Sequence, residues 1–155
     1  MEIVHKWKGQ RKEGSGSGSF LLSSNKNAFF ADGIQSRYKG FYFSKELDWF
    51  KTIHAIKSRE AKKVVNYFSH IEKISDIRES FFIPYKKRTL VYETNKETNT
   101  TIVLDCRKIF DNSDNGRIYF IEKKRNKLVI TYEKKEGDKY VVYVVISGVS
   151  KFNLA

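Results

Sequence analysis

The sequence contains one cysteine, one proline and no long apolar run. Cys106 has no second cysteine with which to form an internal disulfide. No apolar stretch approaches the roughly 20 residues that a membrane-spanning helix needs, and the first residues lack the apolar core of a signal peptide. These absences argue against a disulfide-stapled scaffold and against a membrane protein, and we expect a reducing, cytoplasmic location.

Residue patterns for metal binding and for catalysis are also missing. The histidines His5, His54 and His70 lie far apart, with no Cys or His neighbour at metal-ligand spacing, so we expect neither a zinc site nor a cofactor. No serine or cysteine has an apparent histidine partner, and no two carboxylates stand out as an acid and a base. We therefore expect that the chain alone is not catalytic.

Aromatic and basic residues are abundant. Hydrophobic residues make up 40% of the 155 residues, and 12 Phe with 9 Tyr supply large flat side chains for a sheet-on-sheet core. This composition predicts one folded domain. The formal net charge of +12 attracts polyanions whatever the function of the protein, so charge alone identifies no partner.

The N-terminal residues differ in character from the rest of the chain. Residues 3–8 alternate as an edge strand does, and residues 14–19 are a Gly/Ser run that is typical either of an engineered linker or of a natural mobile loop. We therefore divide the chain into an N-terminal strand with a flexible segment, residues 1–19, and a β-sandwich domain, residues 20–155.

Short apolar runs separated by turn residues predict a mainly β fold. After residue 81 the pattern is β throughout, and the only proline, Pro84, is expected at a strand end or sheet edge because it lacks an N–H donor. The spacing predicts an antiparallel β-sandwich or meander with at most one or two short helices. The predicted strands include residues 89–92, 128–132 and 140–146.

Residues 44–74 allow two interpretations. Ala61, Val64, Val65 and Phe68 recur at helical spacing, which predicts a helix near 58–70. Residues 49–56, in contrast, alternate almost as well as a strand does.

The segment from Thr101 to Glu122 is predicted to be a hairpin. Apolar and polar residues alternate on both sides of a polar run that ends in Asn115-Gly116, a dipeptide that favours tight reversals. The same run places Asp111, Ser113, Asn115 and Glu122 at the spacing of a calcium-binding EF-hand loop. Because its flanks are rich in β-branched residues, we interpret the run as a turn and keep calcium binding as a weaker alternative.

Three basic clusters suggest a second class of function. They lie at residues 6–12, 86–88 and 123–127, with Trp7, Tyr85 and Tyr119 available to stack on bases. No recognition-helix or zinc-finger signature accompanies them. A nucleic-acid-binding module is therefore the alternative function, and solvated turn lysines are the simpler explanation of the clusters.

Several segments resemble a known family. Residues 20–24 read Phe-Leu-Leu-Ser-Ser and residues 36–42 read Ser-Arg-Tyr-Lys-Gly-Phe-Tyr, which is similar to the start of archaeal and bacterial glycogen-debranching (amylo-α-1,6-glucosidase-like) proteins. Lys39 stands where that family usually has histidine. Residues 82–93, 104–111 and 116–119 resemble later strands of the same amino-terminal domain.

The resemblance implies a β-sandwich domain that packs on a separate (α/α)6 barrel carrying the catalytic carboxylates. On this basis we expect a non-catalytic domain or subunit of a split or truncated glucosidase, with the barrel chain as partner and α-glucan as a possible ligand. Arg37, Tyr38, Asp105 and Arg107 are the candidate ligand-binding residues. Asp105 and Arg107 also share one face of a predicted strand, where they could bind each other or a polar ligand.

Overall fold

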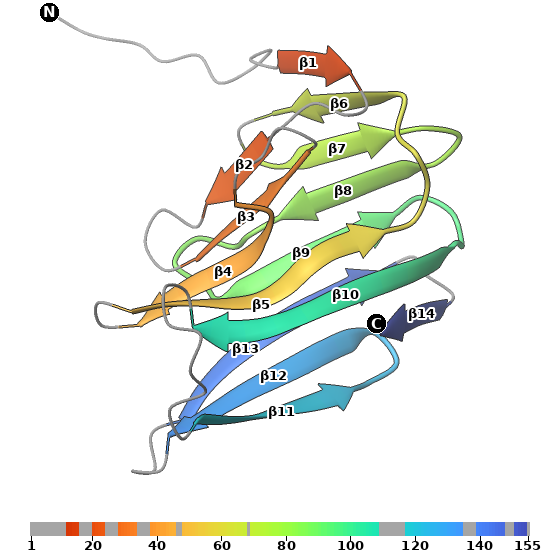
Figure 1. The fold of residues 1–155 in the computed structure, drawn as a ribbon. Coiled ribbons are helices and arrows are strands. Elements are labelled where there is room, and N and C mark those ends of the chain that lie inside the picture. Colours follow the sequence, from red (N-terminus) through yellow and green to blue (C-terminus); the bar gives the residue numbers. More distant parts are fainter. Residues whose placement is uncertain are drawn as a thin grey trace, which may run out of the picture.

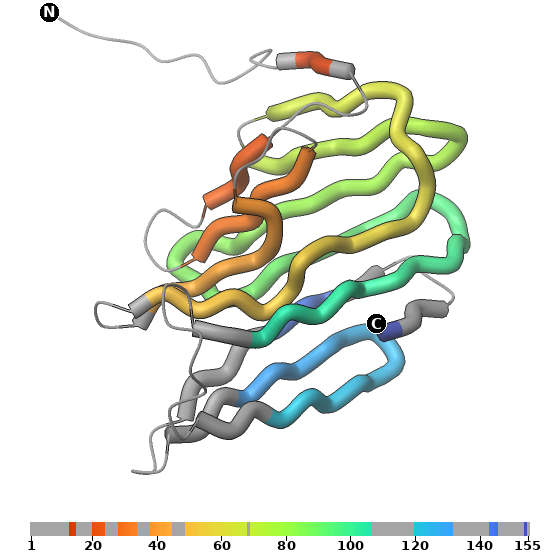
Figure 2. Tube along the Cα trace, in the orientation of Figure 1, coloured from red at the N-terminus to blue at the C-terminus, as the bar shows by residue number. Residues whose placement is uncertain are grey.

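In the computed structural model, the described part of the chain forms two β-sheets that lie face to face (Figure 1). The described residues are 12–15, 20–23, 28–33, 38–45, 48–67, 69–108, 117–134, 139–147 and 151–154. Figure 2 follows the same chain as a tube in the same orientation. The predicted mainly β fold is confirmed, and none of the described residues is helical.

The larger sheet has eight strands. Their spatial order is β1 (Lys12–Ser15), β6 (Lys63–Asn66), β7 (Ile71–Ile74), β8 (Arg78–Phe82), β9 (Thr89–Thr94), β13 (Lys139–Ser147), β12 (Lys127–Lys134) and β11 (Arg117–Lys123). Pro84 lies two residues past the end of β8, in the turn that leads to β9, where its missing donor leaves no ladder bond unmade.

The smaller sheet has six strands. Their order is β14 (Lys151–Leu154), β10 (Asn99–Lys108), β5 (Asp48–Lys57), β4 (Gly40–Lys45), β3 (Ala28–Asp32) and β2 (Phe20–Ser23). Most neighbours in both sheets are antiparallel. Among the described strands two pairs are parallel, β9 with β13 and β10 with β14, so a strand late in the sequence joins each sheet beside a much earlier one.

The core fills the space between the sheets. Phe20 and Phe30 of the smaller sheet both pack on Phe81 of the larger sheet, with ring centroids 6.1 and 5.4 Å from that of Phe81. Leu90, Ile102 and other fully buried side chains extend the same core across β9 and β10. Burial of these large apolar surfaces from both sheets stabilises the sandwich.

The predicted helix near 58–70 is wrong. Residues 63–66 form β6, which pairs with β1 on one side and with β7 on the other, and β5 covers the alternating segment up to Lys57. Val64 and Val65 are both buried in this strand arrangement. β-Branched residues suit a pleated strand, and pairing on both edges outweighs a weak local helical pattern.

The predicted hairpin across Thr101–Glu122 is also wrong in its pairing. Both flanking strands exist, but β10 pairs with β5 and β14 in the smaller sheet, whereas β11 pairs with β12 at the edge of the larger sheet. The chain therefore changes sheets between them. Residues 109–116, including Asn115-Gly116, lie outside the described residues. An alternating pattern predicts strands, but it does not say which strand is the neighbour.

Strand β1 reaches into the segment that the sequence predicts to be flexible. Gly14 and Ser15, which open the predicted flexible segment, belong to β1 and pair with Val64 and Lys63 of β6. The predicted edge strand at residues 3–8 lies outside the described residues. No described segment is a helix long and apolar enough to cross a membrane.

Candidate functional site

Of the four predicted ligand-binding residues, Asp105 has the best-defined surroundings. It lies on β10, and its Oδ2 is 3.0 Å from the Nζ atom of Lys51 on β5. Tyr38 is exposed just before β4. Arg107 pairs through its backbone with Lys51, but its side chain and the whole of Arg37 lie outside the described residues. The described ion-pair partner of Asp105 is therefore Lys51, a residue that the sequence pattern did not single out.

Lys51 is the centre of a small polar cluster. Its side chain is only 4% exposed, and its Nζ atom lies 2.8 Å from Nδ1 of His54 as well as beside Asp105. The same ammonium lies 5.6 Å from the centroid of the Tyr42 ring. A buried ammonium is costly unless it is paired and hydrogen-bonded, and these three neighbours meet that need.

Irregular strand pairing shapes this cluster. On one side of β5, Phe41 pairs with Ile53 and Tyr42 with Lys51, which leaves Thr52 as an extra, bulged residue. The hydroxyl of Thr52 donates a hydrogen bond to the carbonyl of Phe41 at 3.1 Å. Register shifts also interrupt the pairing of β5 with β10. Such bulges turn side chains away from the regular alternation.

Gly40 allows the close approach that the bulge needs. Its φ is +126°, a conformation that side-chain-bearing residues rarely adopt. A Cβ atom there would lie 2.2 Å from the carbonyl oxygen of Ile53 and 2.8 Å from Cε of Lys51. The Gly40 position is therefore tied sterically to the Lys51 cluster.

The surroundings of His54 disfavour its protonated form. Partial burial and then the charge of Lys51 lower the pKa of His54 below its ordinary value of 6.5, while Asp105 acts in the opposite direction. A neutral ring can accept a hydrogen bond from Lys51 at Nδ1, which agrees with the short contact. The Lys51 cluster is thus an internally paired, structural arrangement.

A contact between serine and histidine does occur, contrary to the sequence analysis. Ser69 Oγ lies 2.9 Å from Nδ1 of His70, and Nε2 of His70 lies 3.6 Å from Glu72 Oε1. Ser69 and His70 are neighbours in the turn between β6 and β7, and Ser69 is exposed. The groove described below does not include these residues.

The calcium alternative has little described support. Asp111, Ser113 and Asn115 lie outside the described residues, and Glu122 lies on β11, exposed and 3.7 Å from Lys124 Nζ. The flanking elements are strands β10 and β11, not the helices that an EF-hand requires. The described residues contain no group of three or more His, Cys, Asp or Glu arranged to hold a metal.

The basic clusters do not form one surface in the described structure. Residues 86–88 lie where β9 begins, and residues 123–127 lie at the end of β11. Because β11 and β9 run in the same direction, on either side of β12 and β13, these two turns lie at opposite ends of the larger sheet. Most of the first cluster, at residues 6–12, lies outside the described residues.

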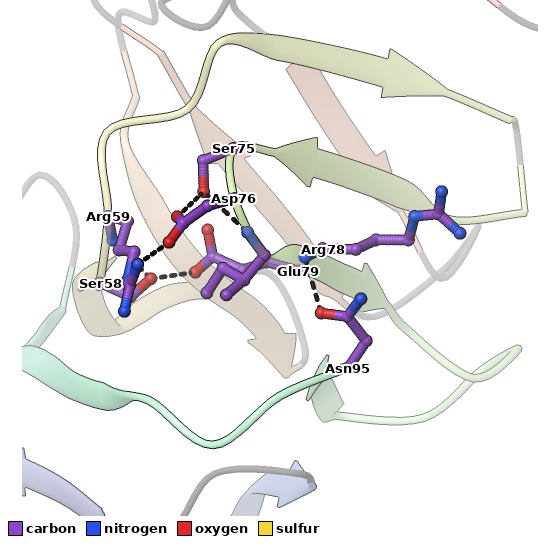
Figure 3. A network of polar contacts seen from close by, with 8 residues as sticks. Ser58, Arg59, Ser75, Asp76, Arg78, Glu79 and Asn95 are labelled. Carbon is purple, nitrogen blue, oxygen red and sulfur yellow. Dashed lines mark hydrogen bonds and ion pairs between the residues drawn. The ribbon is translucent and has the colours of Figure 1, made fainter.

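A second polar network lies where β5 ends and β10 begins (Figure 3). Glu79, on β8, is only 2% exposed, and its Oε1 accepts hydrogen bonds from the hydroxyls of Tyr92 at 2.6 Å and Ser58 at 2.5 Å. Burial, and then the charge of Glu79, raises the pKa of the Tyr92 hydroxyl. Tyr92 therefore stays protonated and remains a donor to Glu79.

The outer part of this network is exposed. Arg59 forms an ion pair with Asp76 in the turn between β7 and β8, and this hydrogen-bonded contact lowers the pKa of Asp76 (Figure 3). In the same region Asn95 Oδ1 accepts a hydrogen bond from the backbone N–H of Arg78 at 2.9 Å. The network thus joins β5, β8 and the loop that follows β9.

An open groove of about 460 Å³ adjoins this network. It is lined by Ser58 and Arg59 after β5 and by Glu97, Thr98 and Asn99 where β10 begins. No pattern in the sequence indicates this groove, because its two halves are about 40 residues apart and carry no motif. Its chemistry is that of hydroxyl, guanidinium, carboxylate and amide groups, all of which can hydrogen-bond a polar ligand.

Comparison with protein-family models, with curated proteins and with solved structures found no match for this chain.

Proposed function

We propose that the chain is a non-catalytic β-sandwich domain of a glycogen-debranching-type glucosidase, which supports a separate (α/α)6 catalytic barrel and contacts α-glucan. The segments at 20–24, 36–42 and 104–119 support this proposal through their resemblance to that family. The two-sheet architecture is of the kind that the resemblance implies.

One observation carries the proposal that the chain is not catalytic: the carboxylates of the two polar clusters are already paired within the protein. Glycoside hydrolysis needs two carboxyl groups flanking the scissile bond. Asp105 is instead paired with Lys51, and Glu79 is buried beneath the hydroxyls of Tyr92 and Ser58. Both carboxylates therefore serve the fold.

A reconstitution assay tests the proposal. The chain and a candidate (α/α)6 barrel chain are assayed for debranching of a branched α-glucan, separately and mixed. We expect no turnover by this chain alone and a higher rate or a higher melting temperature of the barrel in the mixture. Turnover by this chain unaided would overturn the proposal. So would a barrel chain whose debranching rate and melting temperature are both unchanged by this chain.

Nucleic-acid binding is the second candidate function, and one observation favours it. Phe120 on β11 and Tyr143 on β13 are both exposed, and the strand register places them on the same face of the larger sheet. The basic residues 123–125 lie at the end of β11. Exposed aromatic rings on a basic domain suit single-stranded nucleic acid.

Salt dependence discriminates this alternative. Binding of a single-stranded oligonucleotide should weaken log-linearly with salt concentration, and replacing Lys123, Lys124 and Arg125 with glutamine should reduce the slope. Absence of binding near physiological salt would remove the alternative.

A further inference from the structure

The groove beside the buried Glu79 network has a lining with hydrogen-bonding capacity that the protein does not use. In the described part of the chain, the side chains of Glu97, Thr98 and Asn99 make no hydrogen bond or ion pair. Together they offer a carboxylate acceptor, a hydroxyl and an amide. Thr98 is only 8% exposed, and its hydroxyl is able to donate to or accept from a ligand group.

The opposite wall of the groove is held in place. Ser58 Oγ donates to Glu79 and accepts a hydrogen bond from the backbone N–H of Arg59 at 2.5 Å. The Arg59 guanidinium is anchored in turn by Asp76 (Figure 3). A wall that is already fixed loses little conformational entropy when a ligand binds.

The charges of the groove select against ionic ligands. The positive charge of Arg59 is neutralised by Asp76, and Glu97 adds a negative charge that repels phosphate or carboxylate ligands. The lining contains a single carboxylate, and the described residues contain no group of three or more metal-ligating side chains. A divalent cation would therefore lack ligands. The ligand class that suits this lining is therefore a neutral molecule rich in hydroxyl groups.

We propose that this groove is a binding subsite for a neutral sugar, with Glu97 and Asn99 as its main hydrogen-bonding residues. A sugar hydroxyl can donate to the Glu97 carboxylate and accept from the Asn99 amide, while the Thr98 hydroxyl can do either. The proposal rests on the proposed function only in the choice of α-linked glucose as the sugar. It also differs from the sequence prediction, which placed ligand binding at Arg37, Tyr38, Asp105 and Arg107.

An NMR titration of the isolated chain with maltotriose tests the subsite. We expect the side-chain amide signals of Asn99 and the backbone signals of residues 97–99 to shift in a saturable manner. Glu97→Gln should weaken binding about tenfold, because a charged acceptor is replaced by a neutral one. Glu93→Gln is the matched control: it makes the same chemical change at an exposed position of β9 outside the groove, and it should leave binding unchanged.

Inorganic phosphate and calcium ions are titrated as alternative probes. Binding of either one at the groove more tightly than maltotriose would overturn the proposal. Maltotriose binding that is insensitive to Glu97→Gln, or weakened equally by Glu93→Gln, would do the same. In that case the sugar binds elsewhere, and the proposed function, which is judged by debranching with the barrel chain, would still stand. If maltotriose binds at the groove but the chain has no effect on the barrel chain, the glucosidase role is refuted and the sugar subsite stands.

Discussion

Two cation–carboxylate pairs connect different parts of this sandwich, and they differ mainly in burial. In the Lys51–Asp105 pair the side chains are 4% and 33% exposed, and the pair links β5 with β10 inside one sheet. In the Arg59–Asp76 pair they are 47% and 61% exposed, and the pair links the end of β5 to a turn of the other sheet. The same kind of interaction, a cation paired with an aspartate, thus occurs once in a mostly buried and once in an exposed environment.

The difference assigns the two pairs different roles. Removing one partner of a buried pair leaves a charge without water, whereas exposed ions are solvated with or without each other. The Lys51 cluster should therefore contribute to stability, and the Arg59 pair should matter mainly for the shape of the groove.

Gly40→Ala should destabilise the protein most, by about 3 kcal/mol, since it combines backbone strain with a clash against the Ile53 carbonyl. Gly14→Ala is the matched control, because a Cβ at Gly14 meets nothing within 4 Å. Its effect should stay within about 0.5 kcal/mol. Urea unfolding measures both, and equal effects would mean that the β4–β5 bulge is not fixed by Gly40.

Asp105→Asn should cost about 2 kcal/mol, because it removes the carboxylate that faces the buried Lys51 ammonium. This figure is below the usual range for a fully buried pair, since Asp105 is one-third exposed. The double variant Lys51→Met with Asp105→Asn should recover most of the loss. A double variant as unstable as the sum of the two single variants would show that the pair is not coupled.

Tyr92→Phe should cost about 1–2 kcal/mol, because it removes one of two hydroxyl donors from the buried Glu79 carboxylate. Tyr85→Phe is the matched control, because Tyr85 is 67% exposed in a turn. Thermal melts of the two tyrosine variants should differ, and equal melts would indicate that the Glu79 carboxylate does not depend on Tyr92.

His54 should make a small, pH-dependent contribution to stability. Its pKa is lower in the folded chain than the ordinary 6.5, so below about pH 6.5 the unfolded state binds more protons than the folded state does. Stability should therefore rise as pH rises through this window and fall as pH falls. His54→Asn should remove this contribution, so the stability of the wild type minus that of the variant should rise with pH across this window. A stability difference that does not change with pH would contradict the assignment. The side chain is largely exposed, which limits the amplitude.

Arg59→Gln should have the smallest effect, with no resolvable change in melting temperature, because water replaces the lost partner of Asp76. Added salt should likewise leave the melting difference between wild type and variant near zero. A clear destabilisation would mean that the exposed pair contributes more than its surroundings suggest.

The sequence predicted the fold class because alternation and β-branched residues are local signals. Residues 89–92, 128–132 and 140–146 lie within β9, β12 and β13. The helix prediction failed at β6, where pairing with strands distant in sequence outweighs the local spacing. The hairpin prediction failed because alternation carries no information on which sheet a strand joins.

The candidate sites were less predictable for a related reason. Asp105 was identified by its place on a strand, but its partner Lys51 lies in a strand whose bulges have no signature in the sequence. Ser58 and Asn99 meet only because β5 and β10 pair. Long-range register therefore decides both sites, and it follows from the assembled core.

The two parallel strand pairs have a consequence for the rate of folding. Leu90 pairs with Val144, and Ile102 with Leu154, in each case across roughly fifty residues of chain. This high contact order predicts slow folding, because long loops must close before the pairing is rewarded. During synthesis, β9 and β10 would present open edges until β13 and β14 emerge, and open edges invite association between chains.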